Sequence, residues 1–442
     1  MHNQEENEVA VTTVASNKIS KERGKTLENR KTSLNIRKLK KQVKGITLIA
    51  LVVTIIVLLI LAGIAISLTI GNNGIFSRAE TAVNTWRNAE TNEQLAMGDL
   101  EDWMDGYMNG NGGSQGGGTG EGEYNTGTTV EEAKKQNKPF EKDTTITDSC
   151  TPANSIRVPE GFKIAEDSAL TVEDGVVIED KDGNQFVWIP AKTEEKGGAT
   201  INLSAGGTAT IVYKRTDFGK QKGSYSDYSE TMPSDEEEAS VNAWGGYYIG
   251  RFEAGDKEST EAKTMRVSGA SQTNTITIKK DQVPYNYITQ PNAKTKAEEM
   301  DTLQEYTTAT TKLVSSYAWD TAISYIQIKN SDYGTNSPEG NYYNTTFTYT
   351  DIEEASQTKN NNSPTLVPTG QTTAVSNIYD MGGNLYEYTT ESYSNKYSPY
   401  VYRGGSCAIN YDSYPAGYRT NGVGGDSSGD GFRVTLYCST ES

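Results

Sequence analysis

The chain has 442 residues, of which 34% are hydrophobic and 22% charged, with a formal net charge of −17 at pH 7. This length allows two or three domains. The acidic balance argues against nucleic acid as a partner, because phosphate binding needs clustered basic residues. The single histidine is His2, so a protein that had lost its N-terminus could use no histidine as a base or metal ligand.

The first clear pattern in chain order is a basic segment followed by an uncharged one. Residues 34–45 are basic and end in Gly45, and the 25 residues from Ile46 to Ile70 carry no charge. As a helix they would span about 37 Å, enough to cross a bilayer. The basic flank predicts that the N-terminus stays in the cytoplasm.

The glycine precedes the apolar run, whereas an ordinary secretory signal places its cleavage site after that run. The stretch KGITLI, residues 44–49, resembles a type IV prepilin leader. That resemblance implies cleavage by a membrane peptidase between Gly45 and Ile46. Ala50 stands where major pilins carry a glutamate, which argues against a bulk filament subunit and fits a minor pilin or a tethered protein. An uncleaved single-pass anchor is the alternative.

The sequence predicts an α+β C-terminal domain behind this N-terminal membrane and pilin-like helix. Short strands separated by turn residues surround one clear helix at 315–328, with strands at 186–190, 247–253, 385–389 and 432–437. Apolar residues at helical spacing continue the stalk, and the following Gly-rich segment predicts a flexible tether. The predicted parts are a leader (1–45), a transmembrane and stalk helix (46–108), a linker (109–129) and the C-terminal domain (130–442).

Six stretches of the C-terminal domain occur in a characteristic order. They are FVWIPA, YYIGRFEAG, AWDTAISYI, NIYDMGGNLYEYTTE, YRGGS and GFRV. Together they resemble the formylglycine-generating-enzyme (sulfatase-modifying factor) family, a subclass of the C-type lectin fold. The resemblance covers roughly residues 155–438, and Tyr388 stands where the family usually has tryptophan.

The family resemblance also bears on catalysis. Its catalytic members bind copper through two cysteines shortly after the RGGS motif, and a related branch uses a histidine-ligated iron. Here Cys407 directly follows the motif and the next cysteine is Cys438. We therefore expect no enzymatic role, with an oxidase that modifies a partner protein as the alternative. A Cys407–Cys438 disulfide and unpaired thiols are both open, because spacing alone does not decide.

The resemblance further implies a calcium site, since oxygen ligands from a turn suit this ion. In the alternative, Asp380 caps a turn and Glu387 pairs with Arg403 or Arg433. The positions that match the family's calcium ligands are Asp380, Gly383, Leu385 and Glu387.

The segment between the last two motifs has an unusual composition. Its 24 residues, Cys407 to Asp430, contain no Lys, Glu, Gln, Met or Trp, the five types that lack a codon ending in a pyrimidine. This resembles the variable regions of C-type-lectin targets of diversity-generating retroelements, where asparagine codons are randomised at their adenines. An ordinary Gly-rich surface loop is the alternative.

The chemistry of this segment suits recognition, because tyrosines offer rigid contact area and small polar residues adaptable hydrogen bonds. We therefore expect a cell-surface or pilus-associated binding protein, anchored in the membrane, whose domain meets a protein or glycan outside the cell. A minor structural pilin among other pilin-type subunits is a further alternative. The predicted ligand-binding residues are Asn410, Tyr411, Asp412, Ser413, Tyr414, Tyr418, Arg419, Asn421, Asp426 and Ser428.

Overall fold

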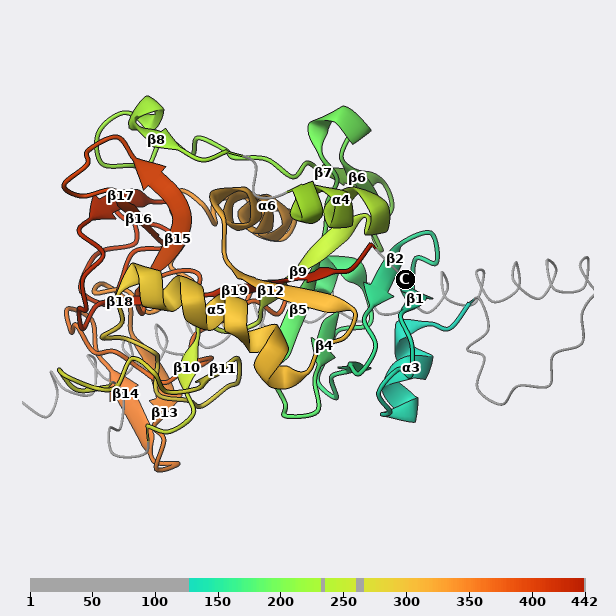
Figure 1. Ribbon diagram of the computed structural model, residues 1–442, viewed down its shortest axis with the longest axis horizontal. Helices are drawn as coiled ribbons and strands as arrows, with labels where there is room; N and C mark the ends of the chain where they lie inside the picture. The colour runs from blue at the N-terminus through green and yellow to red at the C-terminus, as the bar shows by residue number, and fades with distance from the viewer. Residues whose placement is uncertain (1–126, 232–234, 260–265, 441–442) are drawn as a thin grey trace, which may run out of the picture. The chain divides into compact units, whose positions relative to one another are not determined.

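The computed structural model describes residues 127–231, 235–259 and 266–440 (Figure 1). The predicted leader, membrane span and stalk, and all of the predicted linker before Gly127, lie outside these residues. In the part that is described, no helix is both long and apolar enough to cross a bilayer. Contacts divide the chain into two units, Met1–Gln115 and Gly116–Ser442, and the described residues all belong to the second unit.

A six-stranded antiparallel sheet forms the centre of this unit (Figure 1). Four of its strands derive from apolar and aromatic runs, and β5 and β9 correspond to the strands predicted near 186–190 and 247–253. In spatial order the strands are β12 (Ala309–Leu313), β19 (Val434–Cys438), β9 (Gly246–Gly250), β5 (Gln185–Pro190), β4 (Val177–Glu179) and β3 (Lys163–Ile164).

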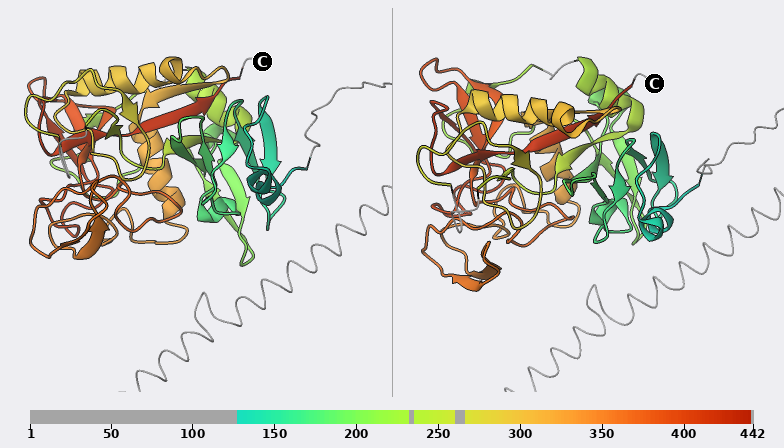
Figure 2. Two further views of the ribbon diagram at one scale, coloured as in Figure 1. Left: turned by 90° about the horizontal axis from the view of Figure 1, so that it is seen from below. Right: turned by 60° about the horizontal axis from the view of Figure 1, so that its bottom comes forward.

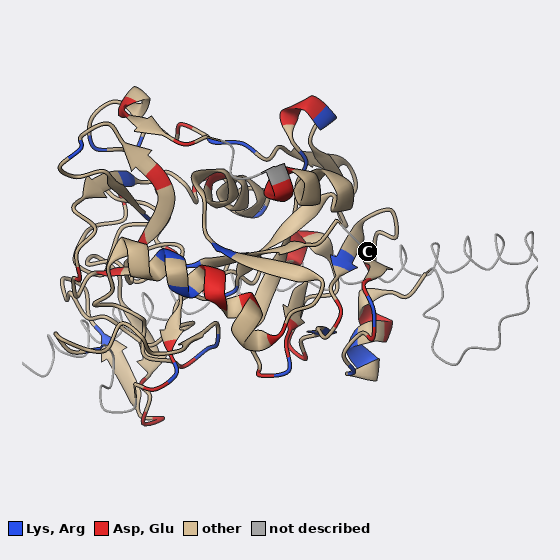
Figure 3. Cartoon of the chain, viewed as in Figure 1, with Lys and Arg blue, Asp and Glu red and all other residues tan. Residues whose placement is uncertain are grey.

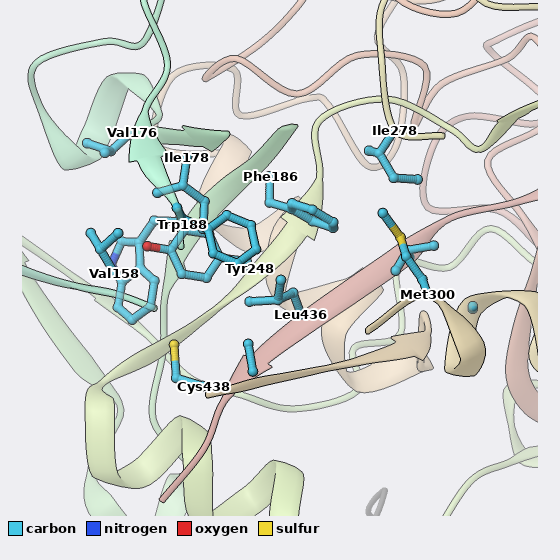
Figure 4. Packing of buried hydrophobic residues seen from close by; sticks show 14 of the residues in the cluster. Val158, Val176, Ile178, Phe186, Trp188, Tyr248, Ile278, Met300, Leu436 and Cys438 are labelled. Carbon is cyan, nitrogen blue, oxygen red and sulfur yellow. The ribbon is translucent and has the colours of Figure 1, made fainter. Parts of the chain in front are cut away.

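Alternate side chains of β5 and β9 enter two hydrophobic cores, because successive residues of a strand point to opposite faces. The first core receives Phe186, Trp188 and Tyr248 (Figure 4), and the second receives Val187, Ile189, Tyr247 and Ile249. Both strands are therefore covered on both faces, which explains why their sequences, apart from Gln185, contain no polar side chain other than tyrosine hydroxyls.

Two helices cover the two faces of the sheet (Figures 1 and 2). Helix α6 (Ser316–Ile326) packs into the second core, and its N-cap Ser315 accepts a hydrogen bond from the backbone of Ala318. Helix α5 (Gln290–Gln304) contributes two alanines and one methionine, Ala293, Ala297 and Met300, to the first core. This weak apolar pattern explains why the sequence predicted α6 and not α5.

A smaller sheet carries the polar segment singled out in the sequence. Strand β15 pairs parallel with β18 and antiparallel with β16 and β8, and β16 pairs antiparallel with β17. The strand predicted at 432–437 is divided at Arg433, where the chain passes from one sheet to the other. The strands are β8 (Tyr228–Ser229), β15 (Tyr386–Tyr393), β16 (Tyr400–Arg403), β17 (Arg419–Gly422) and β18 (Asp430–Phe432).

Short hairpins and turns complete a domain that contains more strand than helix. Two further α-helices, α3 (Val130–Gln136) and α4 (Asp235–Trp244), were not predicted. The remaining elements are β1 (Thr144–Thr147), β2 (Ser155–Val158), η1 (Val172–Asp174), η2 (Glu194–Lys196), β6 (Ala199–Asn202), β7 (Thr208–Ile211), η3 (Tyr225–Asp227), β10 (Gly255–Asp256), β11 (Ile276–Thr277), β13 (Phe347–Thr350) and β14 (Ser356–Lys359).

Candidate ligand-binding site

The polar segment between β16 and β18 is less uniform than its composition suggests. It contains β17, which pairs with β16 so that Arg419 lies opposite Arg403. Residues 415–419 are all buried, so the segment is not a surface loop along its whole length. We call the residues before this buried stretch the first arm (408–414) and those after it the second arm (420–428).

Two carboxylates inside the domain hold the arginines that flank the first arm. Arg403 Nη2 lies 2.6 Å from Asp320 Oδ1, and Arg419 Nε lies 3.1 Å from Glu391 Oε1. Arg419 also contacts Asp320, and none of the four side chains is exposed. We call these four residues the anchor cluster. Since a buried charge that loses its partner is costly, the anchor cluster fixes both ends of the first arm.

Arg403 of the anchor cluster and the adjacent Trp319 also bond to the backbone of the buried stretch. Arg403 Nε donates to the carbonyl of Tyr418 at 3.2 Å, and Trp319 Nε1 donates to that of Ala416 at 3.0 Å. Burial and the nearby charge of Arg419 lower the pKa of Arg403. Burial also opposes the charge of Arg419, but the two carboxylates outweigh it and raise the pKa of Arg419. The stretch therefore belongs to the scaffold.

The structure separates the predicted ligand-binding residues by exposure. Tyr418 is only 8% exposed and Arg419 is fully buried, so the prediction that these two contact a ligand is corrected: they support the surface. Asn410, Asp412, Ser413, Asp426 and Ser428 are exposed, whereas Tyr411, Tyr414 and Asn421 are half-buried.

The first arm rests on a neighbouring segment through its backbone. The amide of Tyr343 donates to the carbonyl of Ile409 at 2.8 Å, and the amide of Tyr411 donates to Asn344 Oδ1 at 3.1 Å. Because these bonds use the backbone of Ile409 and Tyr411, the exposed side chains of the arm are left outside them. Lys220 Nζ adds a bond to the carbonyl of Asp412 at 2.9 Å.

A buried lysine holds that supporting segment in place. The ammonium of Lys359 donates to the carbonyls of Tyr342, Tyr343 and Thr345, the last at 2.8 Å. Burial lowers the pKa of Lys359 to about 8. A lysine in the polar stretch SQTKNNN gave no signal in the sequence, because only the fold turns three carbonyls towards it.

The second arm is held by different neighbours. The amides of Tyr287 and Gln290 donate to the carbonyls of Ser427 and Gly424, at 2.9 Å and 3.2 Å. Asn286 Nδ2 donates to the carbonyl of Ser428 at 2.9 Å. Apart from Tyr418 and Arg419, the predicted ligand-binding residues thus belong to two separately supported arms of one segment.

The two carboxylates at the predicted calcium positions are engaged with protein groups. Both carboxylate oxygens of Glu387 accept from Arg433, at 2.8 Å and 2.9 Å. Asp380 accepts from the amide of Gly370 at 2.7 Å and from Thr372 Oγ1 at 3.1 Å. Burial raises the pKa of Glu387 to about 7, while Arg433 opposes this.

As arranged, Glu387 is a poor calcium ligand, because both of its oxygens face the positive charge of the buried Arg433 guanidinium. Within residues 127–440, gaps excepted, no group of three or more His, Cys, Asp or Glu side chains is placed to hold a metal ion. Calcium at Asp380, Gly383, Leu385 and Glu387 stays a prediction.

The cysteines are not paired. Cys407 packs in a small core with Leu366 and Leu385, whereas Cys438 packs in the first core, and both are free. The disulfide left open by the sequence is therefore not formed. Burial raises the pKa of the Cys407 thiol to about 12. The predicted cleavage positions, Gly45 and Ile46, lie outside the described residues.

The second half of the chain is similar to FGE-sulfatase domains, which have a C-type-lectin-like fold. Residues 219–437 match the family described as the sulfatase-modifying factor enzyme 1-like domain. No curated protein matches the chain.

Solved structures that are similar to the chain share little sequence with it. Treponema denticola variable protein 1 is 14% identical, with a TM-score of 0.31, over 58% of this chain and 96% of that one. CarF is 15% identical, with a TM-score of 0.30, over 48% and 96%. PvdO from Pseudomonas aeruginosa is 14% identical, with a TM-score of 0.31, over 59% and 97%.

The family match corrects one prediction from the sequence. The lack of a second cysteine near the RGGS motif, and of histidine in the domain, led us to expect no enzymatic role. The matched family is described as an enzyme domain, which contradicts that expectation. Catalysis is therefore a candidate function of the domain.

Proposed function

We propose that the two arms form a ligand-binding surface on the FGE-sulfatase domain, and that the ligand is a protein or glycan outside the cell. The main support is that one segment contains both buried residues that hold the scaffold and exposed residues that do not. Arg419 is buried in the anchor cluster and residues 415–418 are buried beside it, whereas Asn410, Asp412 and Ser413 are exposed and make no contribution to either core. These exposed side chains can therefore change without disturbing the fold.

Exposed polar residues beside half-buried tyrosines suit recognition. Tyr411 and Tyr414 each pack one ring edge against another tyrosine, with centroids 6.1 Å from Tyr342 and 4.4 Å from Tyr418. These contacts limit the rotamers of the two tyrosines, so less conformational entropy is lost when they meet a ligand.

The test compares binding of the full-length protein and a variant to a glycan array and to intact bacterial and host cells. The variant carries alanine at Asn410, Asp412, Ser413, Asp426 and Ser428. We expect the wild type to bind and the variant to lose that binding while keeping its melting temperature. Equal binding by both would refute the proposal.

We also propose that the chain is held at the cell surface by its N-terminal apolar segment. The support is the uncharged run from Ile46 to Ile70 behind a basic flank. Protease added to intact cells should then release the domain, whereas a cytoplasmic marker stays intact. Protection of the domain until the cells are lysed would count against this location. Diversification of the arms by a retroelement is part of the proposal and predicts that sister genes differ at the exposed positions.

Catalysis is a second candidate, favoured by the family match alone. A thiol that is buried and has a raised pKa supplies little thiolate at neutral pH, so Cys407 would need a changed environment to react. The full-length protein, incubated with copper and a cysteine-containing peptide, tests this. Turnover that is lost in Cys407→Ser would establish the activity, and the lack of any turnover would remove this copper-and-thiol route.

A further inference from the structure

A cavity of about 510 Å³ lies on the other side of β15 from the anchor cluster. Thr390 and Ser392 line it, whereas Glu391 between them points into the anchor cluster, as expected from the alternation of side chains along a strand. The cavity is thus separate from both arms. Its volume is in the range of pockets that hold small molecules.

One wall of the cavity is fixed by a carboxylate whose bonds are already made. Glu230 accepts from the amide of Ser316 at 2.7 Å and from the hydroxyls of Ser316 and Thr390. These donors place Glu230 rigidly at the N-terminal end of α6. Because both oxygens of Glu230 already accept hydrogen bonds, its role is to form part of the cavity wall and to add negative electrostatic potential, and other groups must contact the ligand.

Two groups of opposite charge face the same space. Glu237 of α4 is buried, with only 6% of the residue exposed, and Lys312 of β12 is half-buried. Lys312 forms no ion pair within 4.0 Å among the described residues, although its charge favours the ionised form of Glu237. Burial, the larger influence, raises the pKa of Glu237 to about 7.

A second pair of opposite charges lies at the more exposed part of the cavity lining. Lys294 and Glu298 lie one helical turn apart on α5, with 3.8 Å between Nζ and Oε1, and both are about half exposed. Figure 3 shows basic and acidic positions following one another along α5. The rest of the lining consists of hydroxyl-bearing side chains and one apolar residue, Leu313.

A ligand for this cavity must therefore be small and polar, and must carry both charges. An anion alone would meet three carboxylates, and a cation alone would meet the ammonium groups of Lys294 and Lys312. We propose that the cavity binds a small zwitterion of the α-amino-acid class, with its carboxylate at Lys312 and its ammonium at Glu237 and Glu298. This site would act independently of the arms.

The experiment titrates the full-length protein with the free α-amino acids by calorimetry, together with thermal-shift measurements. The matched ligand controls are the N-acetyl derivatives, which lack the ammonium, and the amides, which lack the carboxylate. The protein variants are Lys312→Gln and Glu237→Gln, and Lys135→Gln on α3 is the control, since its side chain is 71% exposed and lies outside the cavity lining.

We expect at least one free amino acid to bind, and its N-acetyl and amide forms to bind at least about tenfold more weakly. Lys312→Gln should cause a similar loss, and Lys135→Gln none. Because Lys312 is only half-buried, we expect Lys312→Gln to fold. The proposal can therefore still be tested if Glu237→Gln, a change at a buried residue, fails to fold. Lack of binding by every free amino acid up to about 10 mM would overturn the proposal. So would equal binding by the blocked forms, or unchanged affinity in Lys312→Gln.

Discussion

Arg419 and Glu391 form a fully buried ion pair, with 3.1 Å between Nε and Oε1. Arg419 lies in the middle of the polar segment that the sequence singled out as a binding loop. Its partner lies on β15, in the same sheet, so the pair ties the loop to the scaffold. The segment therefore contains both buried structural residues and exposed residues. Substitution of the buried residues should lower the stability of the domain, whereas substitution of the exposed residues should leave it unchanged.

Breaking this pair should destabilise the domain. We expect Glu391→Gln to lower the free energy of unfolding by about 3 kcal/mol, because Arg215, Arg403 and Arg419 lose one of the carboxylates that balance their charge. Asp412→Asn, an exposed change in the first arm, should stay within about 0.5 kcal/mol. Urea unfolding of both variants, followed by tyrosine fluorescence, measures the difference. Similar stabilities would show that the anchor cluster does not hold the fold.

Removal of the Lys359 ammonium should loosen the first arm. Lys359→Met leaves the carbonyls of Tyr342 and Thr345 without their buried donor, at a cost of about 1–3 kcal/mol for each unsatisfied group. We expect faster hydrogen exchange at the amides of Tyr343 and Tyr411, which brace the arm. Lys396→Met, at an exposed position, is the control. Unchanged exchange rates at both amides would argue against this support.

Asp430 should make stability depend on pH. Burial raises the pKa of its carboxyl to about 7, above the usual value of about 3.9. The folded state then binds more protons than the unfolded state between these values, so stability should fall as pH rises from about 4 to about 7. Asp430→Asn should flatten that slope, by at most about 1.4 kcal/mol per pH unit. Identical slopes in chemical denaturation from pH 4 to pH 8 would contradict the assignment.

Calcium titration tests the site predicted from the sequence, and the contacts of Glu387 argue against binding. Since Arg433 uses both oxygens of Glu387, an ion would first have to displace a buried guanidinium. We expect the same melting temperature in calcium and in chelator, and no heat on titration. Saturable heat together with stabilisation would show that the predicted site rearranges to bind the ion.

The parts of the fold that the sequence predicted are those with strong local signals. The N-cap and apolar pattern of α6, and the aromatic runs of β5 and β9, predicted the positions of these three elements to within a few residues. Helix α5 was missed because few of its side chains are apolar, and β17 because the four residues RTNG have no strand pattern.

The chemistry of the site was less accessible to prediction. Composition marked the segment from Cys407 to Asp430, but it could not separate buried residues from exposed ones. Arg419 was assigned to the ligand because its carboxylate partners, Asp320 and Glu391, lie 99 and 28 residues away in sequence. Such long-range pairing depends on the assembled sheets and leaves no local pattern.

The most direct test of the central claim is the affinity of matched variants for the ligand that the wild type binds on cells or glycans. One variant changes Asn410, Asp412 and Ser413 to alanine, and the other changes Glu194, Glu195 and Lys196 of η2, which are also exposed. We predict that the first loses at least about tenfold in affinity and that the second binds like the wild type. Equal affinity of the two variants would contradict a ligand-binding role for the first arm.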